Sequence, residues 1–146
     1  MGFILTEAGR MLRLTSVVFV VLEYVGSLTV CVGASMAPTI AETGGDYVLL
    51  DKMSHRLHGV RKGDVIVARC PYDPRLDICK RVVAVEGETV QRGRKQVYIP
   101  KGHIWVEGDN KSNSNDSRHY GAVPLGLVFG HVRYRVWPLD RRGMIE

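Results

Sequence analysis

The stretch ICKRVVAVEGE, residues 78–88, decides the fold class of this 146-residue chain. Successive side chains of an extended strand point to opposite faces, so Ile78, Lys80, Val82 and Ala84 share one face. Three of these four side chains are apolar, and a glycine between two acids ends the run. Alternation of this kind is typical of a β-strand with one buried face, and here it predicts a lysine held among apolar side chains.

Further short apolar runs lie on both sides of this stretch, and turn residues separate them. No run beyond Ile40 repeats its apolar residues at the period of a helix. The runs are DYVLLDK (46–52), GDVIVARC (63–70), QVYIP (96–100), HIWVEGD (103–109) and LGLVFGHVRYRVWPL (125–139). We therefore predict a mostly β fold, a barrel or a sandwich, with coil from Gly108 to Tyr120.

The N-terminal part differs, because it is apolar over a length that matches a membrane span. Residues 14–32 carry a single charge, Glu23, and a bilayer span needs roughly 20 mainly apolar residues. Arg10 and Arg13 precede the segment, as the positive-inside rule expects of an N-terminus that is left behind. The alternative interpretation is a core helix followed by a strand, with a break near residues 23–26.

We divide the chain accordingly into two parts. Residues 1–23 are predicted to form a hydrophobic N-terminal helix that anchors the protein to a membrane, and residues 24–146 a β domain that carries the functional groups. Residues 24–32 are rich in β-branched side chains, so we expect part of this stretch to be strand already.

Charge and cysteine content exclude other classes. The net charge of +5 is modest, and the basic residues are spread and interrupted by acids, whereas nucleic-acid-binding proteins concentrate them; no nucleic-acid partner is expected. Cys31, Cys70 and Cys79 form no CxxC pair and have no histidine at ligand spacing, so neither a metal nor another cofactor is expected. Reduced, buried thiols are the favoured state, and a single Cys70–Cys79 bridge is the alternative.

The stretch CVGASMAPTI, residues 31–40, places Ser35 in a turn of small residues. A hydroxyl is a good nucleophile only when an adjacent base takes its proton, and no histidine has an evident acid partner in the sequence. Lys80 could serve if its pKa fell by about three units, or ~4 kcal/mol, which burial among aliphatic side chains can supply. Taken alone, Lys80 is better explained as an edge-strand lysine that reaches out to water.

Four stretches together resemble the type I signal peptidases, serine endopeptidases that use a serine and a lysine as nucleophile and base. GASMAPTI (33–40) is similar to the nucleophile box, and RKGDVIVA (61–68) to the strand box that follows it. ICKRVVAVEGE resembles the box with the general-base lysine, and EGDNKSNSNDSRHYGAVP (107–124) the last box. The similarity runs from about residue 23 to residue 138, and the members most resembled are the mitochondrial inner membrane peptidases of the subunit 1 type.

The resemblance implies that Ser35 is the nucleophile and Lys80 the general base. It also implies a supporting set: Ser114 to orient the lysine amine, Asp109, Asp116 and Arg118 to buttress the site, and Arg81 to pair with one of the acids, Asp109.

Gly33 and Met36 are the expected substrate-binding residues. Gly33 stands where bacterial members often carry a hydroxyl residue that helps to bind the oxyanion, so the backbone N–H of Ser35 would carry more of that task. Met36 would belong to a shallow pocket, and plain packing explains it equally well.

The resemblance implies a membrane-associated peptidase that removes sorting or signal sequences from precursor proteins of the mitochondrial inner membrane and intermembrane space. It would lie in the inner membrane with its catalytic domain facing the intermembrane space, and would assemble with a second peptidase subunit. Three alternatives remain: a compact bacterial or chloroplast signal peptidase, an autoproteolytic repressor with the same chemistry, and an inactive membrane-anchored β module that binds a partner.

Overall fold

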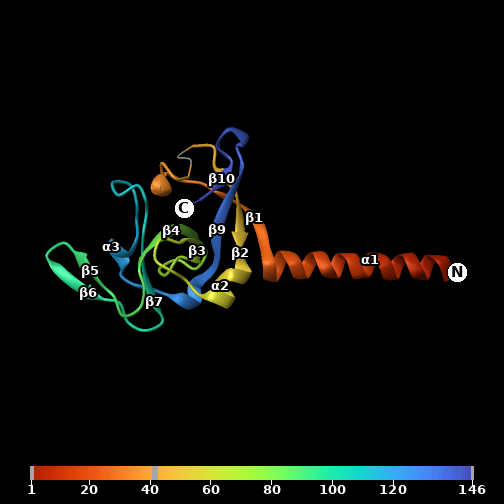
Figure 1. Ribbon diagram of the computed structural model, residues 1–146, viewed down its shortest axis with the longest axis horizontal. Coiled ribbons are helices and arrows are strands. Elements are labelled where there is room, and N and C mark those ends of the chain that lie inside the picture. Colours follow the sequence, from red (N-terminus) through yellow and green to blue (C-terminus); the bar gives the residue numbers. More distant parts are fainter. Residues whose placement is uncertain (1, 41–42, 146) are drawn as a thin grey trace.

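The computed structural model describes residues 2–40 and 43–145 (Figure 1). The helices are α1 (Gly2–Val20), α2 (Lys52–His58) and α3 (Ser117–Tyr120). Shorter helical turns are η1 (Val21–Val25), η2 (Ala34–Met36), η3 (Leu125–Leu127) and η4 (Leu139–Arg141). The strands are β1 (Gly26–Cys31), β2 (Asp46–Asp51), β3 (Val65–Arg69), β4 (Asp77–Ala84), β5 (Thr89–Arg92), β6 (Lys95–Tyr98), β7 (His103–Glu107), β8 (Val123–Pro124), β9 (Val128–Trp137) and β10 (Gly143–Met144).

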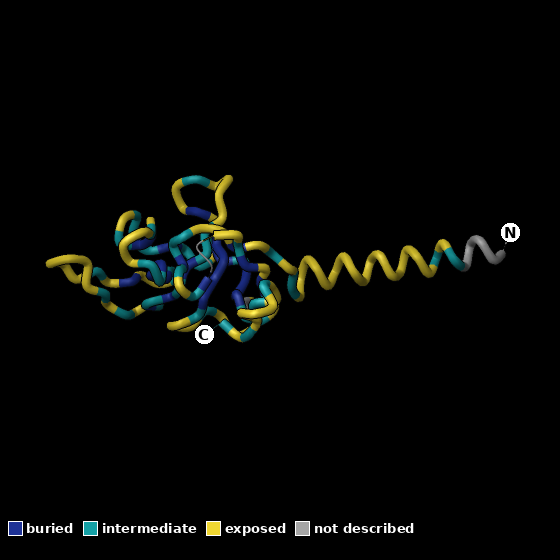
Figure 2. Tube along the Cα trace, turned by 90° about the horizontal axis from the view of Figure 1, so that it is seen from above, coloured by how far each residue is buried: buried dark blue, intermediate teal, exposed yellow. Residues whose placement is uncertain are grey.

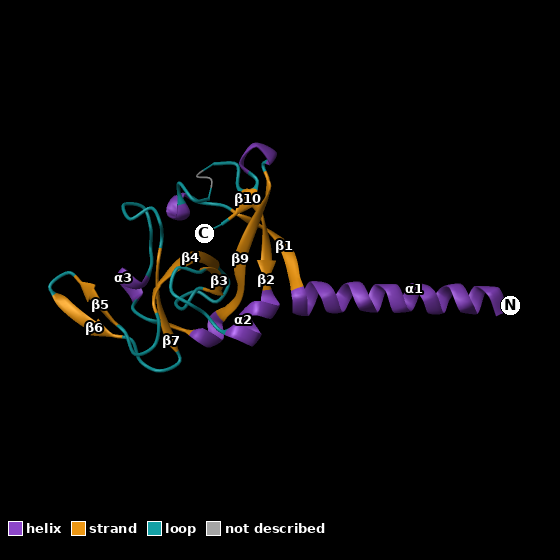
Figure 3. Ribbon diagram, viewed as in Figure 1, coloured by secondary structure: helices purple, strands orange, loops and turns teal. Residues whose placement is uncertain are grey.

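Most of the body is one antiparallel sheet, so the prediction of a mostly β fold is confirmed (Figure 3). Its strand order is β1-β2-β9-β3-β4-β7-β8, β10 pairs with β9, and β5 and β6 form a separate hairpin. Of the predicted barrel or sandwich, a closed barrel is not found, because among the described residues the end strands β1 and β8 do not pair with each other. β8 is only two residues long and ends in Pro124, which lacks the N–H donor that closure would need.

The stretch around Lys80 forms β4, as its alternation predicts. Lys80, Val82 and Ala84 are buried, while the side chains between them are half-buried. β4 pairs along its first five residues with β3, which places Ile66 opposite Lys80. β3 is buried on both faces, because Ile66 belongs to one hydrophobic cluster and Val67 to another. Lys80 is thus buried among core side chains, although it lies in the part of β4 that pairs only with β3.

The N-terminal helix α1 projects from the β body in two perpendicular views (Figures 1 and 2). Its exposed apolar side chains include Leu14 and Phe19, both about two-thirds exposed. The expected break near residues 23–26 is present: the helix ends in the turn η1, and β1 begins at Gly26. The apolar segment 14–32 is therefore divided between helix and strand. Within the described residues, no helix has the length and apolar character of a membrane span.

Two short helices were not predicted. The expected coil of residues 108–120 ends in α3, for which Asp116 is the N-cap and accepts a hydrogen bond from the Arg118 amide. α2 follows directly on Asp51, whose carboxylate accepts a hydrogen bond from the Ser54 amide. Both helices span at most seven residues, which is too short to show a helical repeat of apolar positions, so capping side chains are their only sequence signal.

Candidate active site

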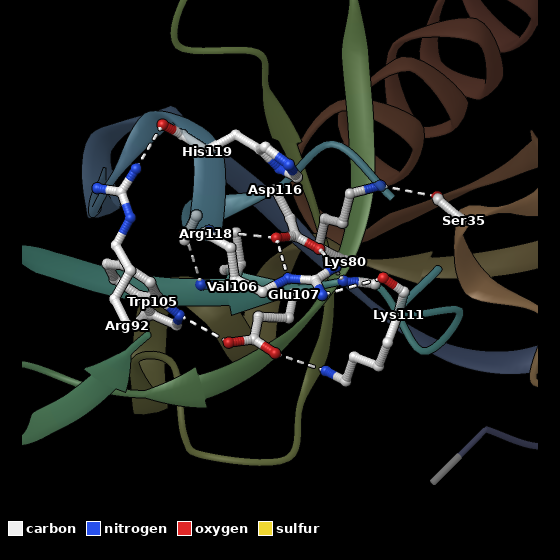
Figure 4. Close-up of polar contacts among 12 residues, drawn as sticks. Ser35, Lys80, Arg92, Trp105, Val106, Glu107, Lys111, Asp116, Arg118 and His119 are labelled. Atoms are coloured by element: carbon white, nitrogen blue, oxygen red, sulfur yellow. Dashed lines mark hydrogen bonds and ion pairs between the residues drawn. The ribbon is translucent and has the colours of Figure 1, made fainter. Parts of the chain in front are cut away.

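Ser35 and Lys80 meet in the folded chain although 44 residues separate them in the sequence. The Lys80 Nζ donates a hydrogen bond of 2.7 Å to the Ser35 Oγ (Figure 4). Lys80 is only 5% exposed, whereas Ser35 is half-buried and reachable from outside. The structure therefore brings a buried amine against an accessible alcohol.

The turn η2 holds Ser35 in place from the side of the core. Gly33 enters the turn with a φ of 114°, a left-handed conformation that favours glycine over any residue with a Cβ. Met36, which follows Ser35, is 2% exposed and packs into the core cluster that also contains Ile40. The Ile40 amide donates a hydrogen bond to the Met36 carbonyl. Met36 thus fastens the turn to the core, while the Ser35 side chain stays at its surface.

A second loop holds the same turn from the other side. The Asn110 amide donates to the Ser35 carbonyl, and the Asn110 side-chain Nδ2 donates to the Ala34 carbonyl, both at 3.0 Å. Gly108 lies so close that a Cβ at this position would overlap the Ser35 carbonyl oxygen and the Ser114 side chain. We did not single out Gly108 and Asn110 from the sequence, although both belong to the GDN triplet of the last matching stretch.

The surroundings of Lys80 lower its pKa. The largest cause is burial, which removes water from the ammonium and favours the neutral amine. Three negative or titratable neighbours, Cys79, Asp116 and Cys70, act in the opposite direction and raise it. The net result is a lysine pKa below its ordinary value, which is the direction that base chemistry requires.

Arg81 and Asp109 form a two-pronged ion pair beside the site. The Arg81 Nε and Nη2 each donate to the Asp109 carboxylate at 2.8 Å, and the Arg81 Nη1 donates to the Gly63 carbonyl at 2.9 Å. Asp109 also accepts a hydrogen bond from the Thr39 hydroxyl, in the segment that follows Ser35. The pair therefore joins β4, next to Lys80, to the segment that follows the reactive turn.

Asp116 is fully buried and gathers its partners from the last loop. Its carboxylate accepts hydrogen bonds from the Arg118 guanidinium at 2.9 Å and from the Gly108 amide at 3.0 Å. Burial raises the pKa of Asp116. These hydrogen bonds lower it by a larger amount, so the net pKa lies well below its usual range. The Ser114 hydroxyl is buried beside this carboxylate, and it makes no hydrogen bond to Lys80, the contact that the resemblance implies.

A small pocket of about 100 Å³ opens beside Ser35 and Lys80. Gly33 and Met36 both line it, which is where the sequence expected substrate contacts. A second hollow of about 170 Å³ continues from it and shares part of its walls. The shared wall consists of Cys31 and Val32 from one side and Asp77, Ile78 and Cys79 from the other.

Other chemistry has less support in the described part of the chain. No group of three His, Cys, Asp or Glu side chains there is placed to hold a metal ion. No acid partner of His131 was evident from the sequence, but the structure places an Asp64 oxygen 3.8 Å from its Nδ1. This histidine is buried in β9 and also contacts Arg133, so it belongs to a separate polar cluster.

Comparison with known proteins agrees with the arrangement. The family model described as signal peptidase, peptidase S26, matches residues 5–100 and 92–137. Mitochondrial inner membrane protease subunit 1 of Mus musculus is 37% identical over 145 residues, covering 95% of this chain and 86% of the relative. The subunit 1 protein of Xenopus tropicalis is 44% identical over 130 residues, covering 85% and 77%. Mitochondrial inner membrane protease subunit 2 of Danio rerio is 40% identical over 120 residues, covering 78% and 66%.

The matches extend over nearly the whole chain and include the turn with Ser35, the strand with Lys80 and the loop that holds them. The chain therefore belongs to the signal peptidase family, peptidase S26, and within it to the mitochondrial inner membrane proteases, and it is a peptidase.

Proposed function

We propose that Ser35 is the nucleophile and Lys80 the general base of an endopeptidase that removes sorting sequences from precursor proteins. The observation that carries this proposal is the 2.7 Å contact between the buried Lys80 amine and the Ser35 hydroxyl. Burial favours the neutral amine, and a neutral amine can accept the serine proton through the same contact.

The reaction proceeds in two halves. The neutral Lys80 removes the Ser35 proton as the alkoxide attacks the scissile carbonyl, and the ammonium then protonates the leaving amine. The resulting acyl-enzyme is cleaved by a water molecule that the same amine activates. The oxyanion of each tetrahedral intermediate is stabilised by the backbone N–H of Ser35, at the turn that Gly33 opens.

Arg81, Asp109, Asp116 and Arg118 act as positioning residues in this proposal. The Arg81–Asp109 pair ties β4 to the segment after Ser35, and Asp116 orders the loop that holds Ser35. Ser114 is the buried hydroxyl of this loop, and in this proposal it acts on the site through the Asp116 carboxylate beside it.

Substrate is proposed to bind as an extended strand in the groove beside Ser35. β1 pairs only with β2, and the first residues of β4 pair only with β3, so each offers a free edge among the described residues. The two hollows lie between these edges. A precursor segment can add backbone hydrogen bonds to such an edge, while the pocket lined by Gly33 and Met36 accepts one side chain.

The relatives' names support a place for this chain in the mitochondrial inner membrane and in an assembly of unlike subunits. We propose that its substrates are precursors of the inner membrane and intermembrane space, that the catalytic domain faces the intermembrane space, and that a second peptidase subunit binds it. Residues 1–23 form the anchor in this proposal, and residues 24–146 the catalytic domain. The exposed apolar side chains at the end of α1 support the anchor.

The test of the dyad compares cleavage of a precursor peptide by the purified full chain and its variants. We expect Ser35→Ala to abolish cleavage and Lys80→Met to slow it by at least about 10²–10⁴-fold, because general-base catalysis has that size. Lys101→Met removes an exposed lysine and is the matched control. Cleavage at the wild-type rate by either dyad variant would refute the assignment and favour an inactive binding module.

The anchor and the partner need separate experiments. Carbonate extraction of mitochondrial membranes should leave the full chain in the pellet and release a version that starts at Tyr24; equal release of both would refute the anchor. Affinity purification of the full chain from solubilised inner membranes should recover a second peptidase subunit in near-equal amount. A stable and fully active monomer would contradict the proposed partner.

A further inference from the structure

Two cysteine side chains contact each other beside the reactive residues. Cys31 is the last residue of β1, and Cys79 directly precedes Lys80 in β4. These strands are not neighbours in the sheet, yet both side chains pack in the same hydrophobic cluster, and each thiol shifts the pKa of the other, so the two lie close together. Both cysteines are free thiols. The pair therefore connects the two strand edges that face each other across the groove.

The same two thiols form part of the wall of the groove. Cys31 and Cys79 line the pocket that contains Ser35 and Lys80, and they also line the adjoining hollow. Both spaces open to solvent, so a small reagent can reach sulfurs that are otherwise well covered by protein. Cys70 is different, because it is 1% exposed and lines neither space. The cysteines of this chain thus divide into a pair that lines the groove and one buried thiol that lies outside it.

We propose that Cys31 and Cys79 form a thiol-modification site that reacts with a small-molecule disulfide and closes into an internal disulfide across the groove. The bond would join β1 to β4 at the entrance to the pocket beside Ser35. The proposed alternative bridge between Cys70 and Cys79 is not favoured by the structure, because the partner that Cys79 contacts is Cys31.

The chemistry is a pair of thiol–disulfide exchanges. The neighbouring Cys79 lowers the pKa of Cys31 by more than burial and the nearby Asp46 raise it, so Cys31 is the attacking thiolate. Its sulfur displaces one thiolate from the small-molecule disulfide and forms a mixed disulfide. Cys79 then gives up its proton to solvent and attacks the Cys31 sulfur, which releases the second thiolate. Two protein thiols are oxidised, and one small-molecule disulfide is reduced to two thiols.

The modification would stop peptide cleavage, and this consequence rests on the proposed function. A disulfide between Cys31 and Cys79 occupies the wall that both hollows share and holds the two strand edges together, so an extended substrate can no longer enter. The bond would also pull on Cys79, the residue next to Lys80. The Lys80 amine must stay within hydrogen-bond distance of Ser35. Reduction of the bond restores the open groove.

The experiment incubates the purified full chain with oxidised glutathione, then alkylates the remaining thiols and maps disulfide-linked peptides by mass spectrometry. We expect a Cys31–Cys79 link with Cys70 still alkylated, a loss of peptide cleavage of about tenfold or more, and recovery with dithiothreitol. Cys70→Ala should respond as the wild type does. Cys31→Ala and Cys79→Ala should form no internal disulfide. The activity of each oxidised variant is compared with that of its own reduced form, and no loss caused by an internal disulfide is expected.

Peptide mapping separates failure of this inference from failure of the proposed function, because the link is read by mass and not by cleavage. An oxidised protein without the Cys31–Cys79 link, or with glutathione retained on a single cysteine, overturns the modification site. A quantitatively linked protein that still cleaves the peptide at the reduced rate overturns the closure of the groove. The loss of cleavage in Ser35→Ala tests the nucleophile, whatever the state of the thiols.

Discussion

Substitution of Gly108 by alanine is the sharpest test of how the site is held together. A Cβ at this position would lie 2.6 Å from the Ser114 Cβ and closer still to the Ser35 carbonyl oxygen. Ordinary van der Waals contacts of a Cβ begin near 3.4 Å. Either the chain that carries Ser35 or the loop that holds it must therefore move away by about 1 Å. The Asn110 amide, which donates to the same carbonyl, would be pushed away with it.

A displacement of about 1 Å at a reacting group lowers a rate by about 10²-fold. Overpacking of this kind also destabilises a fold by about 1–3 kcal/mol. We therefore expect Gly108→Ala to lower kcat about a hundredfold and to reduce the Tm, while the protein remains folded by circular dichroism. The hydrogen bond between Lys80 and Ser35 is the feature that the change should disturb.

The matched control is Gly126→Ala, because a Cβ at this exposed position meets nothing within 4 Å. This variant should keep the wild-type kcat and change stability by less than about 1 kcal/mol. Both variants are measured by peptide cleavage and thermal denaturation at the same pH. If Gly108→Ala cleaves at the wild-type rate, the close packing of the last loop on the Ser35 turn does not position the nucleophile.

Four further predictions concern individual residues of the site. The kcat/KM should rise with pH through an apparent pKa below the ordinary lysine value of 10.5, because burial lowers the pKa of Lys80 and only the neutral amine is active. Asp116→Asn removes a negative charge that raises this pKa, so the rising limb should move to lower pH; a shift to higher pH would contradict the assignment. Asn110→Ala removes the hydrogen bond to the Ala34 carbonyl, worth about 1 kcal/mol, so kcat should fall about fivefold at unchanged KM. An unaltered kcat would show that the bond from the Asn110 backbone amide to the Ser35 carbonyl suffices. Arg81→Lys keeps the charge but loses the two-pronged contact with its half-buried carboxylate partner, so thermal denaturation should report a loss of about 1–2 kcal/mol, and an unchanged Tm would count against this role of the pair.

Local patterns in the sequence were enough to predict the class of the fold, and together with the family resemblance they led us to propose Ser35 and Lys80 as the reactive pair. Alternation along residues 78–88 depends only on neighbouring positions, because successive side chains of a strand point to opposite faces, and it placed Lys80 among buried residues correctly. The break between the N-terminal helix and β1 was readable for the same reason. The short helices α2 and α3 were not, because seven residues or fewer do not complete a pattern.

Whether the sheet closes into a barrel, and most of the contacts around the site residues, could not be predicted from the sequence; the Arg81–Asp109 pair, implied by the resemblance, is the exception. Barrel closure depends on whether strands β1 and β8 meet, and no residue within either strand reports that. The same holds for the close approach of Gly108 to Ser35 and for the contact between Cys31 and Cys79, which lie far apart in the chain.

The sequence by itself determined which groups this protein has for its chemistry, because residue type and strand alternation are local properties. Only the tertiary structure decided which of these groups touch, how much water reaches the Lys80 amine, and where the groove opens. These properties depend on the path of the whole chain, since burial and distance are set by segments that are remote in sequence and packed together in space.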